Sequence, residues 1–117
     1  MEVDAIAGVL VVAVGGDLVS DSLAKLRECL ERAFSGGRPV VLDLVQVTAL
    51  DAAAVRLLLD AHARLGTRLR VVAKRGERVH VALKDAGIAH VLALHRSRAT
   101  ALAASATVAA EPVRAAL

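Results

Sequence analysis

Three aspartates in the middle of the chain, Asp43, Asp51 and Asp60, are the side chains best suited to chemistry. A pair of carboxylates can serve as general acid and general base when their surroundings push their pKa values apart. Asp60, however, has Arg56 and Arg64 four residues away on either side, a spacing typical of ion pairing on a solvated helix face. The serines, histidines and aspartates do not form a recognisable nucleophile arrangement. We therefore expect no catalytic site.

The histidines and the single cysteine do not predict a metal centre. His62, His80, His90 and His95 are scattered, without the HxxxH or CxxC spacing of common zinc sites. Cys29 lies within a helical pattern, so we expect it to be a small buried apolar residue. With one cysteine the chain cannot form an internal disulfide, which agrees with a reducing compartment. We expect neither a metal nor a cofactor.

Composition predicts one soluble domain. The chain has 117 residues, of which 56% are hydrophobic, yet it contains no run of 18 apolar residues that would span a membrane. The first four residues are Met-Glu-Val-Asp, an acidic start unlike the basic start of a secretory signal. We expect a cytoplasmic location, without membrane insertion.

The charge pattern leaves two interpretations of one basic segment. The net charge is +3, and the six cations concentrated in one part of the chain are Arg64, Arg68, Arg70, Lys74, Arg75 and Arg78. They would form either a phosphate-binding edge or, as we favour, a solvated rim of the sheet. The chain has no Trp or Tyr and only one Phe, so stacking of nucleic-acid bases is almost absent. We expect no nucleic-acid partner.

The central aspartates must be positioned by a strand and a helix. Residues 40–44, VVLDL, follow a Gly-Gly-Arg-Pro breaker and predict a buried strand. Residues 52–64 have apolar side chains at helical spacing. Asp51 precedes this helix and is a good N-cap, because its carboxylate can accept hydrogen bonds from the N–H groups of Ala53 or Ala54.

The remaining segments alternate between strand and helix patterns. We expect strands within residues 3–14, with a break near Ala7-Gly8, and at 68–73 and 91–94. We expect a helix over 23–34 that is capped by Ser20 or Asp21, and a second over 77–86 that is ended by Gly87. A last helix should cover 97–104, with Ser97 as its cap. This order predicts an α/β fold, with a mixed central sheet and about four packed helices. The domain should occupy residues 1–105, and the alanine-rich residues 106–117 should be a frayed or disordered tail.

The central segment resembles the core of the STAS domain, which is shared by sulfate transporters and anti-sigma factor antagonists. The matching residues are Leu42-Asp43-Leu44, then Val47-Thr48-Ala49-Leu50 in a short loop, then Asp51-Ala52-Ala53-Ala54 at the start of a helix. In the family, Asp-Ser-Ser-Gly or a close variant opens this helix. The resemblance covers roughly residues 9–103 and implies the STAS fold.

The chain departs from the family at its regulatory position. The resemblance implies that a phosphate would be placed two residues after Asp51, where this chain has Ala53, which lacks a hydroxyl. Gly16-Asp17-Leu18-Val19 also resembles the family's Gly-Glu/Asp-Leu-Asp loop, but Val19 replaces the last acid. The resemblance places this loop beside the phosphorylation loop, so the two losses agree with each other.

The resemblance implies a protein-binding regulatory module. Its expected partner is an anti-sigma factor or kinase-like ATPase, bound without the usual serine switch, and a homodimer is also compatible with it. The expected partner-binding residues are Asp17, Thr48, Asp51, Ala52, Ala53, Ala54 and Arg56. Alternatives are a STAS subunit of a transporter or lipid-transport assembly, and a domain that senses a nucleotide or lipid. Another hydroxyl, on Thr48, Ser20 or Ser22, would remain open to phosphorylation.

Overall fold

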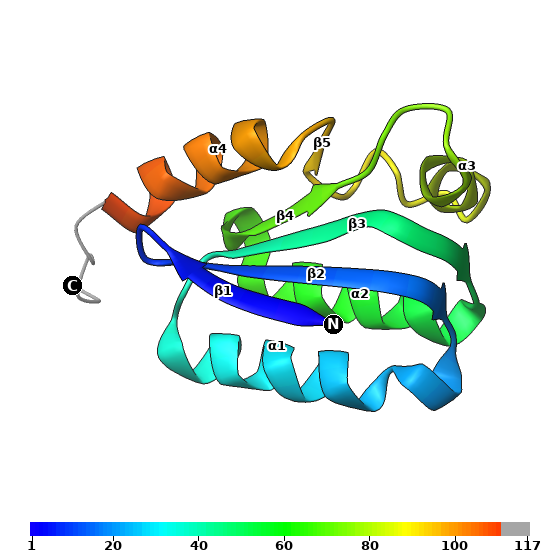
Figure 1. Cartoon of the computed structure of the whole chain (residues 1–117), viewed down its shortest axis with the longest axis horizontal. Helices are drawn as coiled ribbons and strands as arrows, with labels where there is room; N and C mark the ends of the chain where they lie inside the picture. Colours follow the sequence, from blue (N-terminus) through cyan, green and yellow to red (C-terminus); the bar gives the residue numbers. More distant parts are fainter. Residues whose placement is uncertain (111–117) are drawn as a thin grey trace.

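The computed structural model describes residues 1–110, apart from the side chains of Asp21 and of residues 106–110. Five strands form one sheet in the order β1-β2-β3-β4-β5 (Figure 1). Their bounds are β1 Glu2–Ile6, β2 Val9–Leu18, β3 Val40–Leu50, β4 Leu69–Val72 and β5 Leu94–His95. β1 pairs with β2 in the antiparallel direction, and the other neighbours are parallel. The sheet is therefore mixed, as the sequence predicts.

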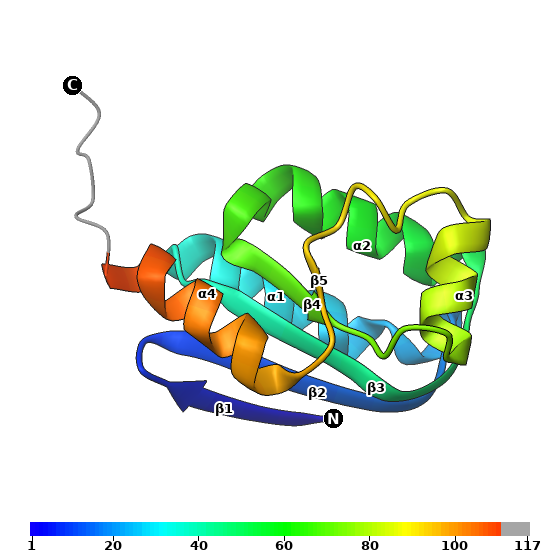
Figure 2. The same cartoon turned by 90° about the horizontal axis from the view of Figure 1, so that it is seen from above.

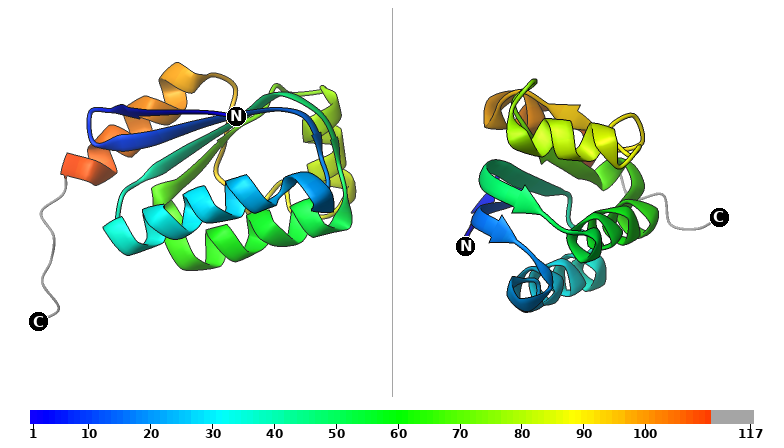
Figure 3. Two further views of the ribbon diagram at one scale, coloured as in Figure 1. Left: turned by 60° about the horizontal axis from the view of Figure 1, so that its bottom comes forward. Right: turned by 90° about the vertical axis from the view of Figure 1, so that its right-hand side faces the viewer.

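Four α-helices pack around this sheet, as expected for the STAS fold. Their bounds are α1 Ala24–Gly36, α2 Ala52–Leu65, α3 Arg78–Asp85 and α4 Arg98–Ala110. α1 and α2 lie side by side under one face, and α4 crosses the other face (Figures 1 and 2). α3 packs against β3 at the end of the sheet opposite the β1–β2 turn (Figure 3).

The core has two layers because helices cover both faces of the sheet. Leu42 and Leu44 of β3 point toward α1 and α2, where they join Leu30 and Leu58 in the larger cluster. Val41 points the other way, into a smaller cluster under α4. A central strand covered on both sides must be apolar along its whole length, which is why residues 40–44 have an almost unbroken hydrophobic pattern.

The end of β3 corrects one expectation. Residues 47–50, predicted as a short loop, are the last part of β3 and pair with the end of β2 as far as Leu18 opposite Leu50. This pairing contains two irregularities in register, between Ala13 and Gly15 and between Gly16 and Asp17. Because the extension depends on this long-range pairing, the local pattern did not reveal it.

Turns and caps follow the sequence with one exception. Ala7 and Gly8 both have positive φ, 51° and 80°, and form the predicted break as a tight hairpin turn. Gly87, with φ 75°, ends α3, and the Ile88 N–H donates to the Leu83 carbonyl over 3.0 Å. The prediction that Ser20 or Asp21 caps α1 is wrong. Residues 20–22 form a separate 3-10 turn, and Leu23 takes the N-cap position of α1.

The C-terminal elements are shifted from their expected bounds. β5 begins at Leu94, three residues later than predicted, and Ser97 caps α4 by accepting the Thr100 N–H over 3.2 Å. α4 continues to Ala110, beyond the expected end near Ala104. The tail prediction for residues 111–117 lies outside the described residues.

Candidate partner-binding surface at the start of α2

The ends of β2 and β3 and the start of α2 meet at one edge of the molecule (Figure 1). The Asp51 N–H donates to the Leu18 carbonyl over 3.3 Å, which joins the end of β2 to the residue that precedes α2. We call the described side chains gathered there the α2 entry surface. Its members are Asp17, Thr48, Asp51, Ala52, Ala53 and Arg56. All of them belong to the set predicted from the sequence.

Asp51 is the N-cap of α2, as predicted. Its Oδ1 accepts the Ala54 N–H over 2.8 Å, and its Oδ2 accepts the Ser20 N–H over 2.9 Å. The hydrogen bond from Ala54, and to a smaller extent the one from Ser20, holds the pKa of the Asp51 carboxyl below its ordinary value. The contact with Ser20 was not predicted, because no local pattern connects residues 31 positions apart.

The hydrogen bond between Asp17 and Thr48 joins the ends of β2 and β3, where the resemblance placed two neighbouring loops. The Thr48 hydroxyl donates to Asp17 Oδ1 over 2.7 Å, and both residues are exposed. The Ser22 hydroxyl accepts the Val19 N–H over 3.1 Å, at the position where the family has an acid. The connection between β2 and α1 is held to the start of α2 by the contact between Ser20 and Asp51, without that acid.

The three alanines differ in their access to a partner. Ala52 is exposed, and Ala53 is half-buried and packs partly against the main core. Ala54 is fully buried, with 0% of its surface exposed. Its inclusion among the contact residues is therefore wrong, since its place on the inner face of α2 directs its side chain into the core. Arg56 is exposed one turn further along α2.

The α2 entry surface offers hydrogen-bonding groups and small side chains. Within residues 1–110, no group of three or more His, Cys, Asp or Glu side chains is placed to hold a metal ion. The Asp51 carboxylate and the Thr48 hydroxyl already have partners within the chain. Their positions are thus fixed before any partner arrives, which suits recognition of another surface.

The basic segment is divided among several structural roles. Arg64 donates to both carboxylate oxygens of Glu31, the shorter contact being 2.7 Å, and its guanidinium lies 3.8 Å from the centre of the Phe34 ring. Arg68 donates to the Gly37 carbonyl over 2.7 Å. These arginines tie α2 and the loop that follows it to α1 and its end. They therefore belong to the packing of the domain.

Comparison with known proteins identifies the family. A family model for the STAS domain matches residues 1–101. The chain belongs to the STAS domain family. No curated protein gives a significant match in sequence. Within the part of the chain that the structure describes, no helix is long and apolar enough to cross a membrane.

Solved structures share the fold. An anti-sigma factor antagonist from Mycobacterium paratuberculosis superposes with a TM-score of 0.79 at 24% identity, covering 89% of this chain and 91% of that one. A putative anti-sigma factor antagonist from Thermotoga maritima gives 0.78 at 11% identity, covering 89% and 92%. The anti-sigma factor antagonist SpoIIAA in its unphosphorylated form gives 0.64 at 12% identity, covering 87% and 93%. The α/β fold predicted from the sequence is confirmed.

Proposed function

We propose that this chain is a non-catalytic regulatory module that binds an anti-sigma factor or a kinase-like ATPase through the α2 entry surface. In this proposal it binds without a serine phosphorylation switch at position 53. The observation that carries it is the pairing of a capping Asp51 with a half-buried Ala53 in the first turn of α2. The partner class comes from the STAS family and from the antagonists that share the fold.

The surface geometry supports protein binding. Ala52 is small and exposed, so a partner can approach the backbone of the first helical turn closely. Asp17 and Thr48 are held together by a 2.7 Å hydrogen bond, so little side-chain freedom is lost when they are covered. Arg56 adds one exposed cation on α2, one turn after its first residue, which favours a partner with an acidic residue at the matching position.

The missing hydroxyl changes the regulation. A phosphate adds close to two negative charges, and on residue 53 it would stand two residues from the Asp51 carboxylate and repel an acidic partner. Ala53 has no oxygen that can accept a phosphate. Among nearby hydroxyls, Thr48 donates to Asp17 and Ser22 contacts the backbone of Val19. The module would therefore stay competent for binding unless another residue is modified.

Affinity capture from the native cell tests the partner class. A tagged full-length chain should retain an anti-sigma factor or kinase-like ATPase, identified by mass spectrometry. Recovery of a transporter ATPase or permease instead would assign the chain to a transport assembly and overturn the proposal.

The captured partner then tests the regulation. We expect the pure partner, incubated with the chain and ATP, to add no phosphate within residues 17–56 and to stay bound. Phosphate on Ser20, Ser22 or Thr48, accompanied by release, would contradict the proposed loss of the switch.

A further inference from the structure

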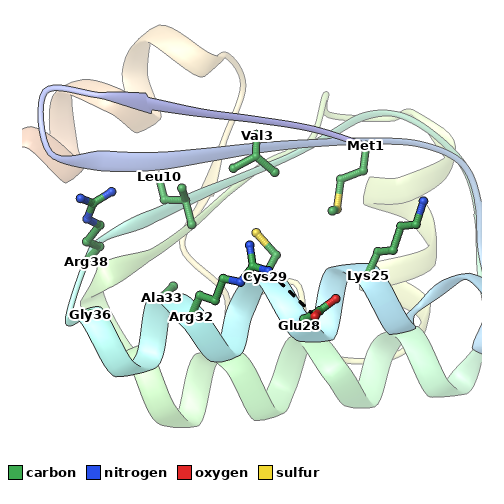
Figure 4. Close-up of a pocket in the computed structure, with 10 residues that line it drawn as sticks. All are labelled: Met1, Val3, Leu10, Lys25, Glu28, Cys29, Arg32, Ala33, Gly36 and Arg38. Atoms are coloured by element: carbon green, nitrogen blue, oxygen red, sulfur yellow. Dashed lines mark ion pairs between the residues drawn. The ribbon is translucent and has the colours of Figure 1, made fainter.

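A cavity lies between the β1–β2 hairpin and α1, away from the α2 entry surface. Its volume is about 630 Å³, within the range of roughly 300–1,000 Å³ that is usual for small-molecule sites. It is lined by Met1, Val3, Leu10, Lys25, Glu28, Cys29, Arg32, Ala33, Gly36 and Arg38. Figure 4 shows side chains from the strands pointing down toward side chains that rise from α1.

The cavity exists because β1 extends the sheet past the helices that cover it. Val3 pairs with Val12, and Val12 belongs to the core cluster between the sheet and α1. Paired residues of neighbouring strands point to the same face, so Val3 also points to the α1 side. Nevertheless 46% of Val3 is exposed, whereas Val12 is fully buried. The apolar face of β1 is therefore left without a covering element.

The cavity combines an apolar interior with a basic rim. Leu10, Cys29 and Ala33 contribute to the apolar surface. The charged lining residues are three cations, Lys25, Arg32 and Arg38, and one acid, Glu28. Arg32 is 3.9 Å from Glu28, in an exposed pair. Lys25 and Arg38 stand at opposite ends (Figure 4), and neither forms an ion pair with another residue that the structure describes.

We propose that this cavity binds a single-chain amphiphile with an anionic head group, either a carboxylate or a phosphate. The hydrocarbon chain would lie between Val3 and Cys29, and the head group would contact the basic rim. Burial of the hydrocarbon chain of the ligand supplies the non-directional part of the affinity, at about 25 cal/mol per Å² of apolar surface buried. The excess of cations over acids at the rim selects a negative head group.

The shape favours a small molecule over a second protein. A stable protein interface buries roughly 800 Å² on each partner. Here the exposed apolar residues of the hairpin that line the cavity are Met1 and Val3, and the rest of its apolar surface is recessed. A concave site of this kind encloses a hydrocarbon chain more completely than it fits a flat protein surface.

Three ten-carbon probes separate the head-group chemistries. Decanoate, decyl phosphate and 1-decanol are titrated below their aggregation limits into the full chain labelled with ¹⁵N. We expect Kd values of about 100 µM or tighter for at least one anion, and binding at least about tenfold weaker for 1-decanol. Amide shifts should centre on Val3, Leu10, Cys29 and Ala33. The anion that binds more tightly shows whether the natural ligand has a carboxylate or a phosphate head group.

Equal binding of 1-decanol and the anions would overturn the anionic preference. Absence of binding by both anions up to 1 mM, or shifts centred on another part of the domain, would overturn the site.

A matched pair of variants on β1 tests the location. Val3 and Ile6 are 46% and 41% exposed, but Ile6 pairs with Val9, which belongs to the cluster on the α4 side. Val3→Glu places an acid in the cavity and should weaken anion binding by about tenfold or more. The added charge repels the anionic head group, and it disfavours burial of the hydrocarbon chain of the ligand beside it. Ile6→Glu adds the same charge on the opposite face and should leave the Kd unchanged. Equal effects would contradict the site.

Two further measurements complete the test. Lys25→Gln combined with Arg38→Gln should weaken anion binding by about fivefold to tenfold, whereas Arg27→Gln, on α1 outside the cavity, should not. Sedimentation of the free chain identifies any dimer. A dimer that dissociates on Val3→Glu but persists on Ile6→Glu would assign the cavity to a second copy of the chain and overturn the ligand proposal. Melting curves confirm that each variant is folded.

Discussion

The Ser20 N–H lies 2.9 Å from Asp51 Oδ2, so the residue that caps α2 also holds the connection between β2 and α1. The other carboxylate oxygen accepts the Ala54 N–H over 2.8 Å. One side chain thus fixes two segments that are far apart in the sequence. A pure N-cap needs one acceptor oxygen, whereas this one uses both.

Substitutions of Asp51 should separate these two contacts. Asp51→Asn keeps one acceptor oxygen for α2, but its amide nitrogen cannot accept the Ser20 N–H, so it should lower Tm less than Asp51→Ala does. We expect Asp51→Ala to lower Tm by roughly 5 °C, from the usual effect of losing a cap in a domain of this size. Asp60→Asn, on the exposed face of α2, is the control and should leave Tm within about 1 °C. Equal losses for Asn and Ala would show that the Ser20 contact dominates.

The same carboxylate should make stability depend on pH. Hydrogen bonds to Ala54 and Ser20 lower the pKa of Asp51 in the folded state from its ordinary value of 3.8. The contribution of the ionised Asp51 to the free energy of unfolding is therefore present above pH 3.8 and is lost as the pH falls through the lowered pKa. The Tm difference between the native chain and Asp51→Ala should be constant from neutral pH down to about pH 5 and shrink in stronger acid. A difference that shrinks between pH 7 and 5 would contradict this assignment.

Negative charge at position 53 should weaken partner binding without unfolding the domain. An acid in the first turn of a helix is compatible with the helix dipole, so Ala53→Asp should fold. It should raise the partner Kd by about tenfold or more, as a phosphate would in the family. Ala63→Asp, at an exposed alanine near the other end of α2, is the control for added charge. Binding is measured by calorimetry with the captured partner. Equal effects of the two variants would remove position 53 from the interface.

Local patterns predicted the parts of the fold that local physics decides. The buried strand at residues 40–44, the cap by Asp51 and the end of α3 at Gly87 each depend on a few neighbouring residues. The extension of β3 to Leu50 depends on pairing with β2, and that pairing is set by long-range contacts. The 3-10 turn at residues 20–22 is closed locally by Ser22 and Val19, but its attachment to α2 through Asp51 is also a long-range contact. Neither the strand extension nor the attachment to Asp51 can be inferred from residues close in sequence.

The candidate surface was predictable for a different reason. Its residues were chosen through the STAS motifs, and the structure brings Asp17, Thr48 and Asp51 to the same edge. Ala54 was wrongly included because three consecutive alanines look alike in sequence, while helix geometry buries Ala54 completely and leaves Ala52 exposed. The cavity under β1 had no sequence signal, since it depends on how far the hairpin extends beyond α1.

The Arg98–Asp43 contact predicts an unequal response to removing either partner. Arg98 on α4 donates two hydrogen bonds, over 2.8 and 3.1 Å, to Asp43 Oδ2 at the centre of β3. The Asp43 side chain is 14% exposed and the Arg98 side chain 44%. Arg98→Ala leaves a largely buried carboxylate with the Val45 N–H alone and should cost about 1–2 kcal/mol of unfolding free energy.

The comparison variant for this pair is Asp43→Asn, which removes the charge. Asp43→Asn should lower the free energy of unfolding less than Arg98→Ala does. The reason is that the exposed Arg98 side chain can be hydrated by water once its partner is gone. Arg96→Ala, two residues away on the exposed surface, controls for loss of a nearby cation. Urea unfolding measures all three. A larger loss for Arg96→Ala than for Arg98→Ala would show that the pair does not hold α4.

Cys29 should react slowly with alkylating reagents, for two reasons that can be separated. Only 8% of the residue is exposed, and burial raises the pKa of its thiol above the ordinary value of 9.0, against a smaller opposite effect of the Arg32 charge. Because the thiolate is the reactive form, alkylation by iodoacetamide at pH 7.5 should be at least about tenfold slower than that of glutathione. The rate should still be rising above pH 9, and guanidinium unfolding should restore the ordinary profile. Arg32→Gln removes the opposing charge and should slow the reaction further. A rate that levels off below pH 8 would indicate a lowered thiol pKa and would contradict this prediction.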